Sequence, residues 1–221
     1  MRKVIVGAFV SLDGVMQGPG GPEEDLEGGF QYGGWVAPLF DEELGQAVGG
    51  MFAEPFDLLL GRRTWDIFAA HWPHVPSDHP DRALADLFNG LTKHVATHRP
   101  ESLDWAGSQS LGEDAIEGVR RLKASDGPHL LTQGSTELLH QLFAADLVDE
   151  LRLMTFPVVL GPGKRLFDAA SSAGAFDLVS SITTPQGVVV STYVRAGQVK
   201  TGDFSLEQPA EEQPGRDKVI G

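Results

Sequence analysis

The 221-residue sequence predicts an α/β fold in which a mostly parallel sheet ends in an antiparallel C-terminal hairpin. Short apolar segments alternate along the chain with segments of helical spacing, a pattern typical of β-α-β units. Near the C-terminus, two strand-like segments are separated only by the turn sequence TPQG, which leaves no room for a crossover helix. Hydrophobic residues make up 41% of the chain and charged residues 22%, as in an ordinary globular protein.

The first predicted strand, residues 4–10, has the sequence VIVGAFV, whose almost continuous apolar character indicates a strand covered on both faces. The same pattern predicts strands at residues 57–60, 94–97, 129–132 and 150–156. Helical spacing between them predicts helices at residues 41–53, 64–70, 83–91, 114–124 and 136–144. Asp114 and Thr136 place capping side chains near the starts of the last two helices.

The C-terminal part has a different pattern. Residues 176–182 and 188–194 are β-prone segments on either side of the turn and predict the hairpin. From residue 199 the chain is rich in Glu, Gln, Pro and Gly and has little apolar periodicity, so it cannot bury enough surface to offset its ordering entropy. We therefore expect one folded domain over residues 1–198 and a flexible acidic tail over residues 199–221.

Composition excludes several classes of function. The chain has 17 basic and 31 acidic residues, and its net charge of -14 repels nucleic acids and anionic membranes, so we expect neither as a partner. The absence of cysteine excludes disulfides, thiolate metal sites and cysteine nucleophiles. The N-terminal apolar segment is broken by Gly7 and is too short for a signal peptide or a membrane span, which indicates a cytoplasmic protein.

Three predicted strands are followed by residues suited to binding an anion. These residues are Gly61, Arg62, Arg63 and Thr64 after the second strand, Thr97, His98 and Arg99 after the third, and Gly134, Ser135 and Thr136 after the fourth. A helix start presents free backbone N–H groups and a positive dipole, and the planar guanidinium group of arginine suits a phosphate. Because ligands of open α/β sheets bind beyond the carboxyl ends of the strands, the three junctions predict a phosphorylated cofactor at one sheet edge.

The order of these segments resembles the dihydrofolate reductase-like superfamily. The resemblance is carried by residues 6–14, 60–65, 95–97, 133–135 and 156–161. The sequence Ser11-Leu12-Asp13-Gly14 is most similar to the branch related to the C-terminal reductase domain of the bifunctional riboflavin-biosynthesis deaminase-reductase. The resemblance covers residues 2–196 and implies a three-layer α/β/α fold, NADPH as the hydride donor and a homodimer.

The resemblance also implies roles for individual residues. Arg62 or Arg63 would lie near the adenosine 2'-phosphate. The expected cofactor-binding residues are Ala8, Gly61, Arg62, Arg63, Thr64, Thr97, His98, Arg99, Gly134, Ser135 and Thr136.

Four residues are candidates on the substrate side: Ser11, Asp13, Trp35 and Lys164. Asp13 is the candidate catalytic residue, which would orient the substrate or relay a proton through water. The alternative is a turn aspartate before Gly14. Trp35 would stack on a flat heterocycle or, alternatively, be an ordinary partly buried tryptophan. Lys164 would meet a substrate phosphate or lie solvated in a turn.

The sequence also departs from the folate enzymes. It has Gln133-Gly134 where they usually have two glycines, and no acid matches their pterin-binding carboxylate, although acids at residues 41–43 lie nearby. Dihydrofolate is therefore disfavoured as the substrate. The acidic cluster at residues 23–25 and the histidines between residues 71 and 79 are expected in solvated loops, without a metal.

These observations predict an NADPH-dependent oxidoreductase acting on a small, flat, nitrogen-containing heterocycle or a related imine or carbonyl. The competing substrates are a ribosylaminopyrimidine of riboflavin biosynthesis and a dihydropterin. The alternative is a noncatalytic NADPH-binding or dimeric scaffold protein with the same fold.

Overall fold

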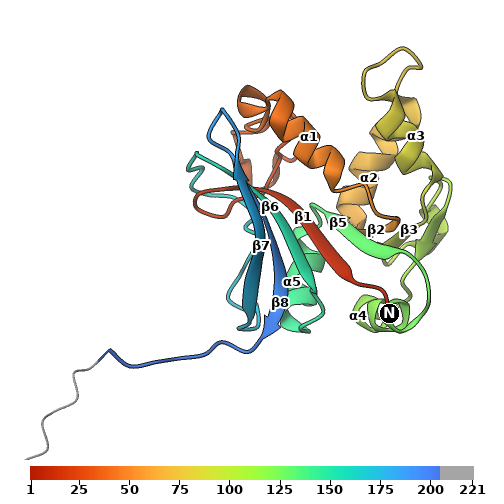
Figure 1. The fold of residues 1–221 in the computed structure, drawn as a ribbon. Coiled ribbons are helices and arrows are strands. Elements are labelled where there is room, and N and C mark those ends of the chain that lie inside the picture. The colour runs from red at the N-terminus through yellow and green to blue at the C-terminus, as the bar shows by residue number, and fades with distance from the viewer. Residues whose placement is uncertain (205–221) are drawn as a thin grey trace, which may run out of the picture.

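The structure is a computed structural model that describes residues 1–204. Its centre is an eight-stranded sheet of order β4-β3-β2-β5-β1-β6-β8-β7 (Figure 1). The strands are β1 (Val4–Ser11), β2 (Phe56–Gly61), β3 (Lys93–Ala96), β4 (Ser108–Ser110), β5 (His129–Gln133), β6 (Glu150–Phe156), β7 (Ala175–Thr183) and β8 (Val189–Gly197). All pairings among β1 to β6 are parallel, whereas β8 is antiparallel to both β6 and β7. This arrangement confirms the predicted fold class.

The α-helices are α1 (Glu42–Gly50), α2 (Arg62–His71), α3 (Arg82–Gly90), α4 (Ala115–Ala124) and α5 (Thr136–Ala144). Short 3-10 helices are η1 (Glu27–Gly29), η2 (Ala37–Leu39), η3 (Trp72–His74) and η4 (Pro100–Ser102). The predicted strands and helices agree with these elements to within a few residues, but β4 was not predicted. Its sequence SQS has no apolar pattern, and it forms a strand because its backbone pairs with β3.

Helices cover both faces of the sheet, as the alternation of side chains along each strand requires. On one face, Val6 of β1 lies in a core cluster with Val119 of α4 and Leu139 of α5. On the other face, Leu58 of β2 lies in a cluster with Trp65 of α2. A third cluster packs α1 near β6. The molecule therefore has the expected three α/β/α layers.

The predicted tail falls mostly outside the described part of the chain. It begins at residue 199, and residues 205–221 are not described by the structure. The domain boundary near residue 198 and the flexible tail therefore stay predictions. Within residues 1–204, no helix has the combined length and apolar character that a membrane span requires.

Lys93 is a fully buried lysine at the start of β3. Its ammonium group donates hydrogen bonds to the carbonyl oxygens of Asn89 at 2.9 Å and Ala106 at 2.8 Å, and it lies 4.3 Å from the ring centroid of Trp105. These partners carry no full negative charge. Burial consequently lowers the pKa of Lys93 to about 8 from its ordinary value of 10.5.

This lowered pKa predicts a stability that changes with pH. Between pH 8 and 10.5 the unfolded chain holds the Lys93 proton more tightly than the folded chain, so the free energy of unfolding should rise with pH across that window. Urea unfolding at several pH values should show the rise in the wild type, and Lys93→Met should remove it. An equal pH dependence in both proteins would contradict this assignment.

Candidate functional site

A cleft of about 1970 Å³ opens at the carboxyl edge of the sheet. Its walls come from β1, from the strand-to-helix junctions after β2 and β5, from the segment after β3 and from the loop at residues 16–27. The structure brings all of the predicted cofactor-binding residues to this cleft: Ala8, Gly61, Arg62, Arg63, Thr64, Thr97, His98, Arg99, Gly134, Ser135 and Thr136.

The two helices that directly follow β2 and β5, namely α2 and α5, begin at the cleft without a side-chain cap. By contrast, the Asp41 carboxylate caps α1 by accepting a hydrogen bond from Leu44 N at 2.8 Å, and Asp114 caps α4 through Glu117 N at 2.9 Å. Thr136, expected as a capping residue, is instead the first residue of α5. The first N–H groups of α2 and α5 are therefore available to an anion.

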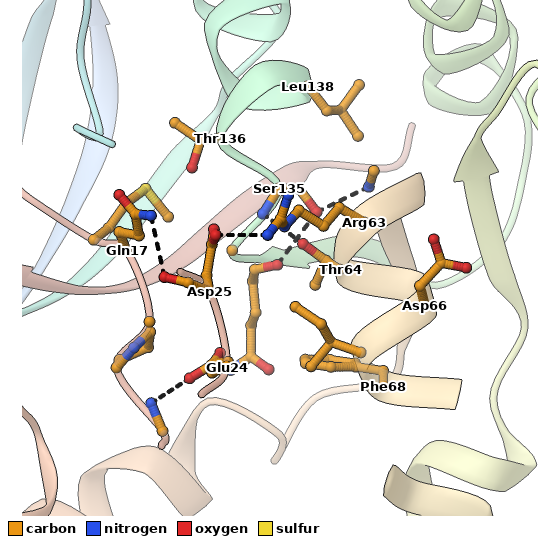
Figure 2. Close-up of a pocket in the computed structure, with 18 of the residues that line it drawn as sticks. Gln17, Glu24, Asp25, Arg63, Thr64, Asp66, Phe68, Ser135, Thr136 and Leu138 are labelled. Carbon is orange, nitrogen blue, oxygen red and sulfur yellow. Dashed lines mark hydrogen bonds and ion pairs between the residues drawn. The ribbon is translucent and has the colours of Figure 1, made fainter. Parts of the chain in front are cut away.

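A pair of hydrogen bonds joins these two helix starts (Figure 2). Gly61 N donates to Ser135 Oγ at 2.8 Å, and Ser135 N donates to Thr64 Oγ1 at 2.9 Å. Gly134 and Ser135 both have left-handed backbone conformations, with φ of 63° and 58°. A Cβ atom on Gly134 would lie 3.1 Å from Thr64 Oγ1. The left-handed conformation and this close contact together favour glycine at position 134.

Arg62 lies at the start of α2, with its side chain directed toward neighbouring groups of the protein. Its Nε atom pairs with Asp66 Oδ1 at 2.9 Å, and its Nη1 atom donates to Ser102 Oγ at 2.6 Å. The guanidinium carbon also lies 4.7 Å from the ring centroid of Trp65. Arg62 thus lines the cleft while its charge is already paired.

Arg63 and Lys164 belong to a four-charge cluster with Asp25 and Glu27. Arg63 binds Asp25 Oδ1 at 2.7 Å and Glu27 Oε2 at 2.8 Å, and Figure 2 shows the pair with Asp25. Lys164 Nζ lies 2.7 Å from a carboxylate oxygen of each acid. The cluster thereby ties the loop at residues 16–27 to the start of α2.

The position of Asp25 corrects the expectation that residues 23–25 form a solvated acidic loop. The Asp25 side chain is only 10% exposed, and it lines the cleft. Burial raises the pKa of the Asp25 carboxyl, but the hydrogen bond from Lys164 and that from Glu27 N, with the charges of Lys164 and Arg63, outweigh burial and lower the pKa below its usual value. Asp25 is therefore held as an anion.

Arg99 follows β3 and differs from the other basic residues of the cleft. Among the described residues that line the cleft, it is the one arginine or lysine whose side chain has no ion pair or hydrogen bond. Thr97 Oγ1 accepts a hydrogen bond from Arg99 N at 3.0 Å and so orders the backbone there. Arg99 consequently offers an unpaired guanidinium group at the carboxyl edge of the sheet.

Asp13 is not among the residues that line the cleft. Its Oδ1 atom accepts hydrogen bonds from Ser11 Oγ at 2.6 Å and Leu160 N at 3.1 Å, and its Oδ2 atom accepts one from Gly161 N at 2.9 Å. These bonds, led by the one from Ser11, lower the pKa of Asp13 to about 2. The carboxylate joins two loops, and so low a pKa makes it a poor proton donor at neutral pH.

We expect Asp13→Ala to destabilise the protein without weakening NADPH binding. Loss of the acceptor leaves the backbone N–H groups of Leu160 and Gly161 without this partner, which should cost about 1–2 kcal/mol of unfolding free energy. Urea unfolding and NADPH titration check both parts, with Asp177→Ala on exposed β7 as the control. Unchanged stability with weakened NADPH binding would place Asp13 in the site instead.

Ser11 and Trp35 also lie away from the cleft lining. Ser11 is buried, and its Oγ atom accepts a hydrogen bond from Val15 N at 2.9 Å while donating to Asp13. The Trp35 indole N–H donates to the Gln17 carbonyl at 2.8 Å, and its ring packs edge-on at 5.2 Å from the ring of Phe156. The structure thus gives Trp35 core contacts. Lys164 alone of the four predicted substrate-side residues lines the cleft.

The acids at residues 41–43 do not line the cleft. Besides capping α1, the Asp41 carboxylate accepts a hydrogen bond from Gln186 N at 3.2 Å. No group of three or more His, Cys, Asp or Glu side chains within residues 1–204 is placed to hold a metal ion.

Part of the cleft is apolar, and sequence analysis missed it. We refer to this part as the apolar bay; its residues are Phe9, Val36, Phe40, Val48, Phe52 and Met154. They come from β1, α1, β6, the positions on either side of η2 and the segment that follows α1. No helix or strand contributes more than one of the six residues, so no local sequence pattern distinguishes them.

The chain is similar to known proteins in both sequence and fold. The sequence profile of the RibD C-terminal domain matches residues 2–190. The uncharacterized Bacillus subtilis (strain 168) protein YyaP is 27% identical over 194 residues, which cover 87% of this chain and 94% of YyaP.

Two solved structures share the fold. A Shewanella sp. PV-4 protein whose name associates it with riboflavin biosynthesis has a TM-score of 0.61 and 20% identity, covering 88% of this chain and 99% of that one. Enterococcus faecalis dihydrofolate reductase, complexed with NADP(H), has a TM-score of 0.53 and 14% identity over 88% of this chain and 96% of its own. These structures confirm the dihydrofolate reductase-like fold. Because the profile match covers residues 2–190, well over half of the chain, the chain belongs to the RibD C-terminal domain family.

Proposed function

We propose that the protein is an NADPH-dependent reductase acting on a small, flat heterocycle or a related conjugated carbonyl compound. The observation that carries this proposal is the presence, in one cleft, of two joined and uncapped helix starts together with the unpaired Arg99. A dinucleotide with a 2'-phosphate has the two anionic groups that such a site suits.

The residues present fit NADPH. The first N–H groups of α2 and α5 would bind the pyrophosphate, and Arg99 with Thr97 and His98 would bind the 2'-phosphate. Gly7 and Ala8 of β1 also line the cleft. Bound NADPH would supply the hydride, while the chain contributes position and a water-poor surface.

Several findings support a reductase of this kind. The related Enterococcus faecalis protein is a dihydrofolate reductase complexed with NADP(H), and the Shewanella relative is named for riboflavin biosynthesis. We therefore propose an oxidoreductase that shares the fold of riboflavin-type and pterin-type reductases and acts in the cytoplasm as a homodimer.

Two measurements test the proposal. Titration with NADPH, followed by the change in nicotinamide fluorescence, should show saturable binding that is tighter than that of NADH. Loss of NADPH absorbance should then be recorded with a panel of pterins, flavin precursors, quinones and enones, and at least one acceptor should be reduced. Absence of NADPH binding would contradict the proposal. Tight binding without turnover of any acceptor would favour the scaffold alternative.

A further inference from the structure

We infer that the acceptor is a neutral conjugated carbonyl compound of the quinone or enone type, and neither a phosphorylated nor a folate-like anion. This inference rests on the proposed function, because it names the substrate of the same cleft. Three features of the cleft carry it: the apolar bay, the pairing of its basic residues and the ionised state of Asp25.

The apolar bay favours a flat and uncharged ligand. Phe9, Phe40 and Phe52 offer ring surfaces on which a flat molecule can pack, and Val36, Val48 and Met154 complete the apolar lining. A charged group that entered this part of the cleft would lose hydration without gaining a partner there. The bay therefore selects against phosphates, sulfonates and carboxylates.

The basic residues near the bay, Arg63 and Lys164, are already paired with carboxylates. Arg63 and Lys164 each bind both Asp25 and Glu27, so the four-charge cluster is neutral as a group. The unpaired Arg99 follows β3, which is separated from β1 by β2 and β5. The three spacings between neighbouring strands from β3 to β1 add up to about 14 Å. A phosphate on the acceptor would therefore lie far from the one unpaired arginine described in the cleft.

The proton requirement separates carbonyl acceptors from pterins. Reduction of a carbon–nitrogen double bond needs an acid at the nitrogen, and Asp25 is held as an anion by Lys164 and Arg63. A conjugated carbonyl places the developing charge on its oxygen, which water can protonate. In the overall step a hydride from NADPH and a proton from water add to the acceptor, which loses one π bond and gains two bonds to hydrogen. These are two oxygen–hydrogen bonds in the hydroquinone formed from a quinone, or two carbon–hydrogen bonds in the saturated ketone formed from an enone. NADPH becomes NADP+, and the hydroxide left by water is neutralised by the solvent buffer.

A matched pair of acceptors tests the inference: 1,4-naphthoquinone and its 2-sulfonate. Binding to the cofactor-free protein can be followed by quenching of tryptophan fluorescence, since Trp72 lines the cleft. We expect the neutral quinone to bind at least about tenfold more tightly than the sulfonate. With NADPH present, kcat/KM corrected for the uncatalysed rate should favour the neutral quinone by a similar factor.

A charge placed in the bay should change this preference. Val48 is half-buried on α1. The Val48→Lys variant should bind the neutral quinone more weakly and the sulfonate more tightly, so that the ratio of the two affinities moves toward or past one. The matched control is Val179→Lys on β7, at a position that is 62% exposed and does not line the cleft. It should keep the wild-type ratio.

The outcomes separate this inference from the proposed function. NADPH titration of the same preparations tests the cofactor site alone, and its failure would overturn the proposed function. If NADPH binds but the sulfonate binds as tightly as the neutral quinone, the inference is overturned and the proposed function stands. The same holds if dihydrofolate or a phosphorylated ribosylaminopyrimidine gives a higher kcat/KM than the quinone.

Discussion

Gly134→Val is expected to raise the dissociation constant for NADPH at least about 100-fold, because a branched side chain at a positive φ is strained by some 2–3 kcal/mol. The strain falls on the turn before α5. The new Cβ atom would lie 3.1 Å from Thr64 Oγ1, the atom that accepts the hydrogen bond from Ser135 N. Relief of this contact would move the starts of α2 and α5 apart, and the proposed pyrophosphate site would lose its shape.

The control for this variant is Gly187→Val in the hairpin turn. Gly187 also has a positive φ, of 79°, and its added Cβ would meet nothing closer than Pro157 Cγ at 3.7 Å. It therefore imposes similar backbone strain away from the cleft. NADPH titration of both variants, after circular dichroism has shown that each is folded, checks the prediction. Normal NADPH affinity in folded Gly134→Val would contradict the assigned role of the α5 start.

Arg99→Ala is expected to weaken the binding of NADPH about 10- to 100-fold, since a charge-assisted contact to the 2'-phosphate contributes about 1.5–3 kcal/mol. The affinity for NADH, which has no 2'-phosphate, should stay nearly unchanged. Arg99 has no competing partner among the described residues of the cleft. Arg63, by contrast, is bound by two carboxylates, so Arg63→Ala should change the ratio of the two affinities far less.

Dissociation constants for NADPH and NADH should be measured in the wild type and in both variants. They show whether Arg99 or Arg63 contacts the 2'-phosphate. The sequence interpretation placed Arg62 or Arg63 at the 2'-phosphate, and the ion pairs of those residues move our expectation to Arg99. A selective loss of NADPH affinity in Arg63→Ala, with none in Arg99→Ala, would restore the original assignment. Equal losses of NADPH and NADH affinity in Arg99→Ala would show that it does not contact the 2'-phosphate.

The sequence was informative about the fold because its main elements depend on local signals. Buried strands such as β1 and β2 have nearly continuous apolar sequences, and the turn at residues 184–187 left no room for a helix between β7 and β8. The junctions after β2, β3 and β5 could be predicted to lie in one cleft because parallel strands align their carboxyl ends at one edge of the sheet.

The features that sequence analysis missed depend on contacts between distant segments. Asp25 resembles a solvated loop acid until Arg63 and Lys164 are seen to bind it across 38 and 139 residues of sequence. Asp13 has the local pattern of a site residue, yet its partner Gly161 lies 148 residues away. No short-range pattern encodes such pairs.

The apolar bay was missed for a related reason. Three of its members are single residues of β1, α1 and β6, and the other three lie in connecting segments. Only the three-dimensional arrangement shows that Phe40 and Val48 border a cleft. Sequence reasoning alone could therefore suggest a cofactor, whose binding residues follow strands, more readily than an acceptor.

The central claim is that this cleft binds NADPH with its pyrophosphate at the starts of α2 and α5, and a crystal structure of the NADPH complex tests it most directly. We expect electron density for the pyrophosphate against the N–H groups of both helices, the 2'-phosphate within hydrogen-bonding distance of Arg99, and the nicotinamide beside Gly7 and Ala8 of β1. A nucleotide bound elsewhere, or bound here with its phosphates away from both helix starts, would contradict the account.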